Sequence, residues 1–370
     1  MALAAAPGPA GGRARALGYH GSRCLQMAGG RMARVTVKDV AREAGVSVAT
    51  VSRVINQNGR FSADTERRVR QAIERLGYQP NQLARGLRQQ RADLVGVVVP
   101  NISNEFFSRL IMTVQQRLFD AGLSIMIFNT NHSLDMERQC YASLAAQRVC
   151  GVISANALED VRAAMRHDVP VVYIDRPAEL APHVSVVMSD NVAGGRLAAR
   201  ELVRSGCTRP LLVSATAHFP ITEVRTKSFA DTLAELGVFL PDDHVLTPPA
   251  TDFAGGHAAA EEALARGLDF DGVFCETDRL AIGFMNELGE KGVRVPADVT
   301  VVGFDDVLLA RFGRPPLTTV RQSPERIGEL AAYTLLQMVR GELAEGRREL
   351  VPVELVRRES TMRGGVVADS

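Results

Sequence analysis

Near the start of the chain, apolar residues recur every three or four positions in two short stretches separated by a glycine. The first, 37–44 (VKDVAREA), predicts a two-turn helix in which Thr36 accepts hydrogen bonds from the first free N–H groups. Gly45 tolerates the positive φ that ends such a helix, and Ser47 is placed to cap a second helix at 48–55 (VATVSRVI). Two short helices joined by a glycine-containing turn predict a helix-turn-helix, whose second helix enters the DNA major groove. An ordinary helical hairpin has the same pattern and is the alternative.

A third amphipathic helix is predicted after a loop, NQNGRF, with Ser62 as its N-cap. Its apolar residues fall at i, i+3, i+4 and i+7 and close a three-helix core: Val69, Ala72, Ile73 and Leu76. Gly77 ends this helix, and Pro80 prevents its continuation. Residues 81–87 leave room for one or two helical turns, a length too short to be stable alone.

From Leu94 onward the pattern changes to alternating strands and helices. Apolar runs predict buried strands at 94–100, 123–129, 151–154, 170–175, 185–189, 210–214, 272–275 and 299–304. Helical patterns lie near 105–121, 135–147, 158–167, 192–205, 222–236, 255–265 and 278–291. Each strand that feeds a helix predicts an α/β core of two lobes built on doubly wound parallel sheets. Segments 315–328 and 350–360 return to the lobes, so the chain is expected to cross between them several times.

The net charge of +1 hides a basic amino-terminal part and an acidic remainder. Residues 1–32 carry four Arg and no acid, and residues 33–93 carry twelve Lys or Arg against six Asp or Glu. The remaining 277 residues carry 27 basic and 36 acidic side chains. A basic head on an acidic body suits one module that binds nucleic-acid phosphates and a body that does not.

The cysteines and the first residues limit where the protein works. Five cysteines are scattered and lack metal-ligand spacing, so buried thiols in a reducing cytosol are expected, with neither a metal nor a cofactor. No run of 18 apolar residues is present, so no membrane span is expected. Residues 1–31 have no periodicity. They predict either a disordered basic arm or a start codon placed too early, with Met32 as the usual start.

The sequence from Val35 to Leu87 resembles, without a gap, the DNA-binding headpiece of the lactose/galactose-repressor (LacI/GalR) family. The run GVSVATVSRVIN is similar to the galactose-repressor type in particular, and later motifs extend the resemblance to about Ser360. It implies an all-α helix-turn-helix headpiece, a hinge helix that orders on DNA, and a core like a periplasmic sugar-binding protein. No leucine-heptad tail follows Ser360, so a homodimer is expected rather than a tetramer.

On this basis the domains can be assigned by residue range. We expect a disordered extension at 1–34, a helix-turn-helix domain at 35–80, a hinge helix and linker at 81–92, an effector-binding and dimerisation core at 93–361, and a disordered tail at 362–370. Within the core, lobe 1 is expected at about 93–190 and 322–350, and lobe 2 at about 191–321 and 351–361.

Candidate DNA-binding residues lie on the second helix and in the hinge. Arg53 is the candidate for a bidentate contact with a guanine edge, with a generic phosphate contact as the alternative. Val48 and Ala49 cannot hydrogen-bond through their side chains, so they select bases only by shape and methyl contact. The resemblance implies phosphate or base-edge partners at Thr36, Ser47, Thr50, Ser52, Asn56 and Arg60. It also implies hinge contacts at Tyr78, Asn81 and Ala84, and a wedging side chain, Leu87, that bends the DNA at a central CpG step.

The effector cleft is expected between the lobes, beyond the carboxyl ends of the strands. The resemblance places Phe106, Phe107, Asp175 and Arg176 on the first wall, Arg225, Thr277 and Asp305 on the second, and Gln322 where the chain recrosses. An aromatic ring suits the apolar face of a sugar, and acid and Arg groups suit its hydroxyls. Asp305 and Arg225 are expected to bind the effector rather than to hold the fold.

Other residues near the cleft have simpler interpretations. Phe107 and Asp306 are candidates for packing and capping, and Asp278 for an N-cap. Lys227 follows the cleft arginine, where it is either solvated or indicates an acidic sugar. The role of Phe253 as a second aromatic platform stays open.

These features predict a cytoplasmic, homodimeric transcriptional regulator, most simply a repressor. It would bind a pseudo-palindromic operator in double-stranded DNA and respond, as inducer or co-repressor, to a sugar or related molecule. An enzyme is one alternative, but the sequence has no nucleophile elbow, no GxxxxGK[ST] loop and no His/Cys cluster. A sugar-binding protein is the other, and it explains the two lobes but not residues 35–87.

Overall fold

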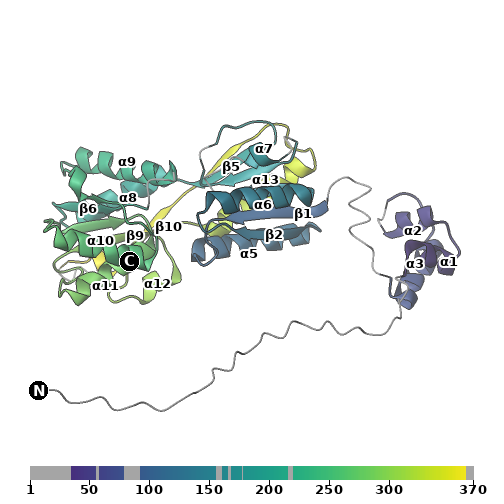
Figure 1. Ribbon diagram of the computed structural model, residues 1–370, viewed down its shortest axis with the longest axis horizontal. Helices are drawn as coiled ribbons and strands as arrows, with labels where there is room; N and C mark the ends of the chain where they lie inside the picture. Colours follow the sequence, from purple (N-terminus) through teal and green to yellow (C-terminus); the bar gives the residue numbers. More distant parts are fainter. Residues whose placement is uncertain are drawn as a thin grey trace, which may run out of the picture. The chain divides into compact units, whose positions relative to one another are not determined.

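The computed structural model describes residues 35–55, 58–78, 92–155, 161–165, 168–176, 178–215 and 220–363. The chain divides into two compact units, Met1–Pro80 and Asn81–Ser370 (Figure 1). The extension at 1–34, the hinge segment at 81–87 and residues 364–370 of the expected tail lie outside the described residues.

Three helices form the first unit: α1 (Val37–Ala44), α2 (Val48–Ile55) and α3 (Ala63–Leu76). Their apolar stripes meet in one core, in which Val40, Val51 and Val69 are completely buried. Gly45 adopts φ 63° and closes α1, because a residue without a Cβ takes the left-handed conformation at little cost. The predicted helix-turn-helix with a supporting third helix is therefore confirmed.

Short polar side chains satisfy the first amides of these helices. The hydroxyl of Ser47 accepts from the N–H of Thr50 at 3.1 Å, and that of Ser62 accepts from the N–H of Thr65 at 3.2 Å. The cap of α1 depends on Asp39, whose carboxylate accepts from the backbone N–H of Thr36 at 3.0 Å and from its hydroxyl at 2.7 Å. Thr36 thus donates to its partner three residues on, beyond the acceptor role that the sequence predicted for it.

The second unit contains two six-stranded sheets with helices on both faces (Figure 1). The first sheet has the order β11-β5-β4-β3-β1-β2, with every neighbouring pair parallel. Its strands are β1 (Ala92–Val99), β2 (Ser124–Asn129), β3 (Val149–Ser154), β4 (Val171–Ile174), β5 (Val184–Ser189) and β11 (Arg348–Val351). One face packs on α5 (Glu105–Asp120) and α13 (Pro324–Val339). The other packs on α6 (Leu134–Ala146) and α7 (Val161–Ala164). This sheet and its helices are called lobe 1.

The second sheet has the order β12-β10-β9-β8-β6-β7. Its strands are β6 (Pro210–Val213), β7 (Val245–Leu246), β8 (Gly272–Cys275), β9 (Thr300–Asp305), β10 (Thr318–Arg321) and β12 (Glu354–Val356). Helices α8 (Asn191–Arg204) and α9 (Pro220–Glu235) pack on one face. Helices α10 (Phe253–Ala265) and α11 (Asp278–Glu290) pack on the other. This sheet and its helices, with the short α12 (Leu308–Phe312), are called lobe 2.

The two doubly wound sheets confirm the predicted fold class, with one departure at an edge. Strand β12 runs antiparallel to β10, whereas the other pairs of the second sheet are parallel. The chain passes between the lobes three times: between β5 and α8, between β10 and α13, and between β11 and β12. Only two residues separate β11 in lobe 1 from β12 in lobe 2. Strand β12 therefore enters the second sheet at the end where β10 leaves it.

Two smaller expectations concern cysteines and the chain end. Cys140, Cys150, Cys207 and Cys275 are buried thiols rather than disulfides, as expected, and Cys24 lies outside the described residues. Arg363, assigned to the tail, contacts the core, with its Nε donating to the carbonyl of Pro296 at 3.3 Å.

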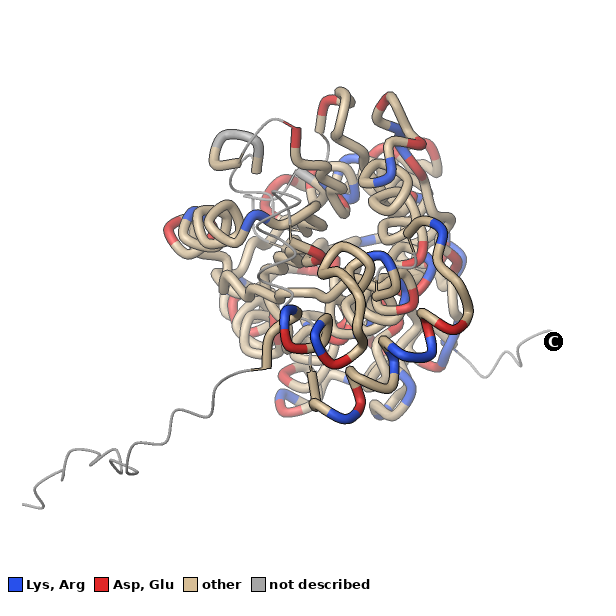
Figure 2. Tube along the Cα trace, turned by 90° about the vertical axis from the view of Figure 1, so that its right-hand side faces the viewer, with Lys and Arg blue, Asp and Glu red and all other residues tan. Residues whose placement is uncertain are grey.

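Among the described residues, no helix has the length and apolarity needed to cross a membrane. Charged residues of both signs are interspersed along the trace (Figure 2).

Candidate functional sites

The exposed side of α2 carries the side chains predicted to read DNA. Ala49 and Arg53 are exposed, and Thr50 and Ser52 are half-buried. Val48 is half-buried and packs partly against the headpiece core, which leaves only part of its side chain for the predicted methyl contact with a base. A side chain in the first turn of a helix leans toward the preceding turn, which here brings Val48 over the core.

The basic side chains of the headpiece fall into two groups. Five of them lie 2.7–3.4 Å from a carboxylate of the same unit: Arg42, Arg67, Arg68, Arg70 and Arg75. Lys38, Arg53 and Arg60 form no ion pair with any described residue. These three cations therefore have no ion pair to break before they contact phosphates or base edges. Arg53 and Arg60 are among the predicted DNA-binding residues.

The remaining predicted headpiece residues have mixed positions. Thr36 and Ser47 are exposed and take part in helix caps, and the Ser47 and Thr50 hydroxyl oxygens lie 2.9 Å apart. Tyr78 is half-buried and packs against the headpiece core. The other four candidates lie outside the described residues: Asn56, Asn81, Ala84 and Leu87.

A pocket lies between the lobes at the carboxyl ends of the strands. Strand order changes direction between β1 and β3 in lobe 1 and between β6 and β8 in lobe 2, and open α/β sheets bind ligands at such switch points. Pro100 follows β1, Ala155 follows β3, Ala215 lies just beyond β6, and Thr277 lies just beyond β8. The backbone topology of both lobes thus converges on this one pocket.

The structure brings most of the predicted effector residues to the pocket wall. They are Phe106, Phe107, Asp175, Arg225, Thr277, Asp305 and Gln322. Arg176 is the exception, because its guanidinium carbon lies 4.8 Å from the centroid of the Tyr173 ring and its side chain does not line the pocket. Asp175 directly before it adopts φ 46°, so the chain turns sharply there and the two neighbours diverge.

Two aromatic rings form part of the lobe 1 wall. Phe106 and Phe107 meet edge to face, with ring centroids 5.2 Å apart and planes at 83°. Phe106 is buried, whereas Phe107 is half-buried and also packs on the lobe 1 core. Phe107 therefore combines the packing role and the pocket role that the sequence left as alternatives.

Two aspartates, Asp305 buried and Asp175 half-buried, face the pocket from opposite lobes. Asp305 accepts from Gln322 Nε2 at 2.6 Å, and Asp175 accepts from the N–H of Ser189 at 2.8 Å. Burial raises the pKa of Asp305 to about 7, against the opposing effects of Arg225, of the Gln322 hydrogen bond and of Arg279. Asp305 also adopts φ 120°, a conformation that L residues rarely take. Such backbone strain concentrates at functional sites.

Arg225 is more deeply integrated than the sequence predicted. It is buried, its Nε donates to Asn191 Oδ1 at 2.6 Å, and its Nη1 donates to the carbonyl of Glu276 at 2.9 Å. Its guanidinium carbon lies 3.8 Å from the centroid of the Phe304 ring. Arg225 therefore holds part of lobe 2 together as well as lining the pocket, which corrects the expectation that it serves the effector alone.

Several pocket residues were missed at the sequence level. They are Pro100, Asn101, Asn104, His132, Ala155, Ala215, Ile221, Thr222, Thr251 and Arg279. Asn101 follows strand β1, and Asn104 caps α5 by accepting from the N–H of Phe106 at 3.0 Å. Their position after a predicted strand was a usable signal. No pattern marked His132 or Thr251, which lie on loops.

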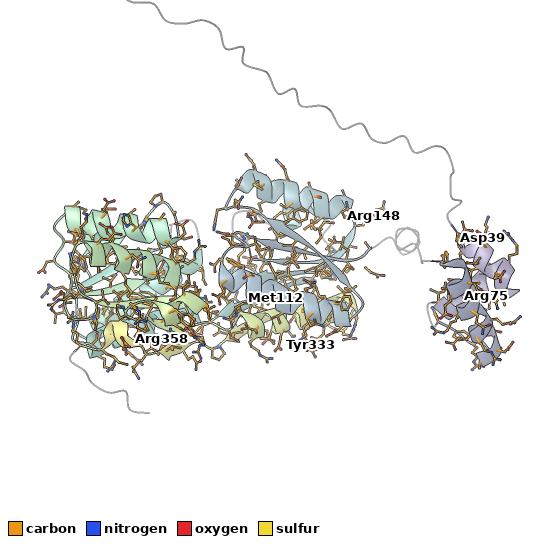
Figure 3. The ribbon with its side chains drawn as sticks, turned by 90° about the horizontal axis from the view of Figure 1, so that it is seen from below. Asp39, Arg75, Met112, Arg148, Tyr333 and Arg358 are labelled. Carbon is orange, nitrogen blue, oxygen red and sulfur yellow. The ribbon has the colours of Figure 1, made fainter. Side chains whose placement is uncertain are left out.

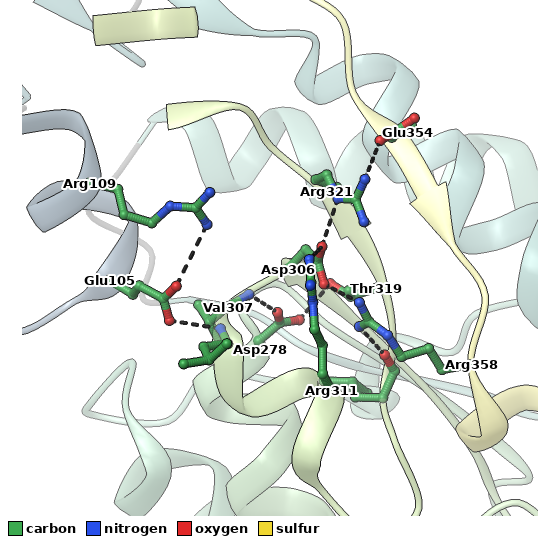
Figure 4. A network of polar contacts seen from close by, with 12 residues as sticks. Glu105, Arg109, Asp278, Asp306, Val307, Arg311, Thr319, Arg321, Glu354 and Arg358 are labelled. Carbon is green, nitrogen blue, oxygen red and sulfur yellow. Dashed lines mark hydrogen bonds and ion pairs between the residues drawn. The ribbon is translucent and has the colours of Figure 1, made fainter. Parts of the chain in front are cut away.

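Residues assigned to packing or capping have defined partners outside the pocket. Thr277, not Asp278, caps α11, because its hydroxyl accepts from the N–H of Leu280 at 3.2 Å. Asp278 is buried and accepts from the N–H of Val307 at 2.9 Å and from the Thr319 hydroxyl at 2.6 Å (Figure 4). It thereby ties the start of α11 to the strand end at β9 and to β10.

Asp306 belongs to an ion-pair network rather than to a cap. It accepts from Arg321 Nε at 2.7 Å and from Arg358 Nη2, and Arg311 lies 3.6 Å away (Figure 4). Burial pushes its pKa upward, but the hydrogen bonds from Arg358 and Arg321 outweigh burial and hold the pKa below its usual value. Neighbouring aspartates at the end of β9 thus have pKa values shifted in opposite directions.

Lys227 and Phe253 are also placed by the structure. Lys227 is exposed, and its Nζ lies 2.7 Å from Asp231 Oδ2, one helical turn further along α9. The ring of Phe253 does not line the pocket but lies under Arg279, with the guanidinium carbon 5.1 Å from the ring centroid. The second cation at the pocket, after Arg225, is therefore Arg279 rather than Lys227.

One further contact joins the lobes. The carboxylate of Glu105, at the start of α5, accepts from the N–H of Leu308, at the start of α12, at 2.7 Å (Figure 4). Glu105 also lies 3.6 Å from Arg109, which in turn lies 2.7 Å from Glu325. The hydrogen bond from Leu308 links the first helix of lobe 1 to a short helix of lobe 2, whereas the two ion pairs lie within lobe 1.

Comparison with known proteins covers both units. The model of bacterial regulatory proteins, lacI family, matches residues 36–81, and the periplasmic binding protein-like domain matches residues 199–361. The HTH-type transcriptional regulator GalR of Escherichia coli is 36% identical over 88% of this chain and 95% of its own length. The ribose operon repressor of Bacillus subtilis is 32% identical over 89% of this chain and 99% of its own length.

Solved structures give the same correspondence in three dimensions. A lac repressor dimer bound to operator and the anti-inducer ONPF superposes with a TM-score of 0.78 and 28% identity, over 89% of this chain and 99% of that chain. The transcriptional regulator CelR in complex with cellobiose superposes with a TM-score of 0.66 and 31% identity, over 88% of this chain and 100% of that chain.

Proposed function

The chain belongs to the lacI family of bacterial regulatory proteins, and on that premise we propose that it represses genes of carbohydrate use by binding operator DNA. A sugar or sugar derivative bound between the lobes controls this binding. One observation carries the proposal: the same chain contains a helix-turn-helix and a pocket at the switch points of two sheets. Three cations of the helix-turn-helix unit form no ion pair with any described residue. A sugar-binding protein needs only the second feature, and an enzyme needs neither.

On DNA, α2 lies in the major groove and Arg53 binds a guanine edge bidentately, since this exposed guanidinium forms no ion pair among the described residues. Val48 and Ala49 contact bases through methyl groups. Backbone phosphates or base edges are bound by the remaining polar candidates, namely Thr36, Ser47, Thr50, Ser52, Asn56 and Arg60. Tyr78, Asn81, Ala84 and Leu87 serve the hinge, with Leu87 wedged into a central CpG step.

In the pocket, the buried polar groups suit a polyhydroxylated ligand. Asp305 and Asp175 accept from hydroxyl groups, Gln322 and Arg225 donate to them, and the Phe106 and Phe107 rings pack on the apolar face of the sugar. Arg176 has no part in this proposal, because its side chain lies against Tyr173. Binding shifts the population of lobe arrangements and thereby changes operator affinity.

Exposed apolar side chains support a homodimer. Met112 on α5 and Tyr333 on α13, both labelled in Figure 3, are 66% and 55% exposed on two helices that pack together in lobe 1. In lobe 2, the short α12 exposes Leu308, Leu309 and Phe312. Two-fold pairing of these faces presents two helix-turn-helix units to a pseudo-palindromic operator.

A mobility-shift assay with DNA from upstream of the chain's own gene tests the proposal. We expect a discrete complex that resists competition by random DNA and responds to a sugar found by thermal-shift screening of the full chain. Sugar binding without any preference for a DNA sequence would instead identify a sugar-binding protein.

A further inference from the structure

Arg279 is a cation of the pocket wall that forms no ion pair within the described chain, although its charge acts on the nearby Asp305 carboxyl. It is half-buried, it lines the pocket, and it forms no ion pair with any described residue. The ring of Phe253, 5.1 Å from its guanidinium carbon, supports one face of the group and leaves its N–H edges unoccupied by protein acceptors within the described chain. These N–H groups point in fixed directions, as in a fork suited to two oxygens.

The neighbouring cations are committed elsewhere. Arg225 donates from Nε to Asn191 Oδ1 and from Nη1 to the carbonyl of Glu276, and its guanidinium stacks on the Phe304 ring. Lys227 is 76% exposed and paired with Asp231. Arg279 therefore differs from both, since it lines the pocket and pairs with no carboxylate among the described residues.

The surroundings of Arg279 favour an anion over a neutral group. The residue occupies the first turn of α11, a 13-residue helix whose amides add partial positive charge at that end, and the buried Asp278 of the same turn accepts hydrogen bonds from Val307 and Thr319. The two carboxyls of the pocket already have protein partners: Gln322 donates to Asp305, and Ser189 donates to Asp175. A half-desolvated guanidinium gains most from an ionised oxygen group, which binds it bidentately.

We propose that the effector carries an anionic oxygen group, a carboxylate or a phosphate, which binds Arg279 while Asp305 and Gln322 bind hydroxyl groups of the same molecule. The ligand class is thus an acidic sugar derivative rather than a neutral sugar. This inference rests on the proposed function, because it names the ligand of the same pocket.

Calorimetric titration of the full chain with matched neutral and acidic sugars tests the inference. The pairs are galactose with galacturonate and glucose with glucuronate, and glucose 6-phosphate separates a phosphate from a carboxylate preference. We expect an acidic member to bind at least about tenfold more tightly than its neutral partner, since charge-assisted hydrogen bonds are worth roughly 1.5–3 kcal/mol. Arg279→Gln should remove most of that preference, and Arg279→Lys should keep part of it.

Lys227→Gln is the matched control, because it removes a cation from the same lobe without touching the pocket. It should leave the preference unchanged. Equal or tighter binding of the neutral sugars, with Arg279→Gln behaving like the unsubstituted chain, would overturn the inference and leave the proposed function intact. Failure of neutral and acidic sugars alike to bind would contradict the proposed function itself, and the inference with it. Melting curves of each variant show that it is folded.

Discussion

Gln322 donates a hydrogen bond from Nε2 to Oδ1 of Asp305 at 2.6 Å, and the same amide accepts from the hydroxyl of Ser189 at 2.6 Å. Asp305 ends β9 in lobe 2 and Ser189 ends β5 in lobe 1. Two consecutive hydrogen bonds therefore connect the lobes through a residue of the pocket wall. A ligand that binds Asp305 acts directly on the bonds that hold the lobes in one arrangement.

The raised pKa of Asp305 predicts a pH dependence of stability. Burial raises this pKa to about 7, so the folded chain keeps the proton between pH about 4 and 7, where the unfolded chain has lost it. Stability therefore falls as pH rises through that window. Asp305→Asn removes the titrating group, and Asn tolerates the same backbone conformation. Between pH 5 and 8 the folded variant should therefore lose less stability than the unsubstituted chain, and the two losses should differ by roughly 1–4 kcal/mol.

Asp306→Asn is the control for that experiment, because the pKa of Asp306 is held low by Arg358 and Arg321. Its contribution is present above the unfolded pKa and is lost as pH falls, so this variant should lose stability at neutral pH. Thermal melting of both variants from pH 5 to 8 provides the measurement. Parallel pH profiles of the two variants would contradict the assignment.

The two arginines of the pocket should affect stability differently. Arg225→Ala removes two hydrogen bonds and a ring contact from a buried site, so the ligand-free core should lose about 2–4 kcal/mol. Arg279→Ala removes a half-buried group without an ion pair among the described residues, and should cost less than about 0.5 kcal/mol. Denaturant unfolding of the two variants measures the contrast, and equal losses would show that one of the two environments is wrongly described.

The bond between Glu105 and the N–H of Leu308 should influence how the lobes are arranged. Glu105→Ala removes an acceptor that joins α5 to α12, so the ligand-free core should populate more open arrangements while its melting temperature changes little. Distances between spin labels on the two lobes report this change. Glu329→Ala is the control, because its ion pair with Arg117 lies within lobe 1. Unchanged interlobe distances in Glu105→Ala would show that this bond does not influence how the lobes are arranged.

Arg53 should provide sequence specificity rather than general affinity. Arg53→Ala should weaken operator binding by about 1–3 kcal/mol and change binding to random DNA much less, because the contact is with a base edge. Arg67→Ala serves as the control, since Arg67 is paired with Asp64 at 2.7 Å on α3. Fluorescence anisotropy with both DNAs measures the difference. Equal loss on operator and random DNA would assign Arg53 to a phosphate.

Much of the pocket was predictable because parallel strands deliver their carboxyl ends to one edge. Asp305 directly follows an apolar run, and the family resemblance placed it at the cleft, where the strand ends meet. Arg176 shows the limit, because one residue after Asp175 a turn with φ 46° sends the side chain onto Tyr173. Arg279 was missed for the opposite reason. The direction of a side chain in the first turn of a helix depends on where that helix begins, and capping by Thr277 decides that locally.

The elements themselves followed from periodicity, and their exceptions have physical causes. The apolar spacing predicted α5 to within one residue of its observed end at Asp120. Helix α12 has only five residues, too few to show a period. The antiparallel direction of β12 depends on the passage from β11 to the other lobe, which no local pattern records.

The central claim is that a ligand in the pocket controls binding of the headpiece to DNA. Its most direct test is an anisotropy titration of the full chain against its operator, with and without a saturating ligand identified by calorimetry, repeated with Asp305→Ala. We predict that the ligand changes operator affinity of the unsubstituted chain at least about tenfold, a coupling of roughly 1.4 kcal/mol. Asp305→Ala should show no such change relative to its own ligand-free operator affinity. Operator affinity that ignores a ligand bound in the pocket, or an Asp305→Ala variant that responds fully, would contradict the account.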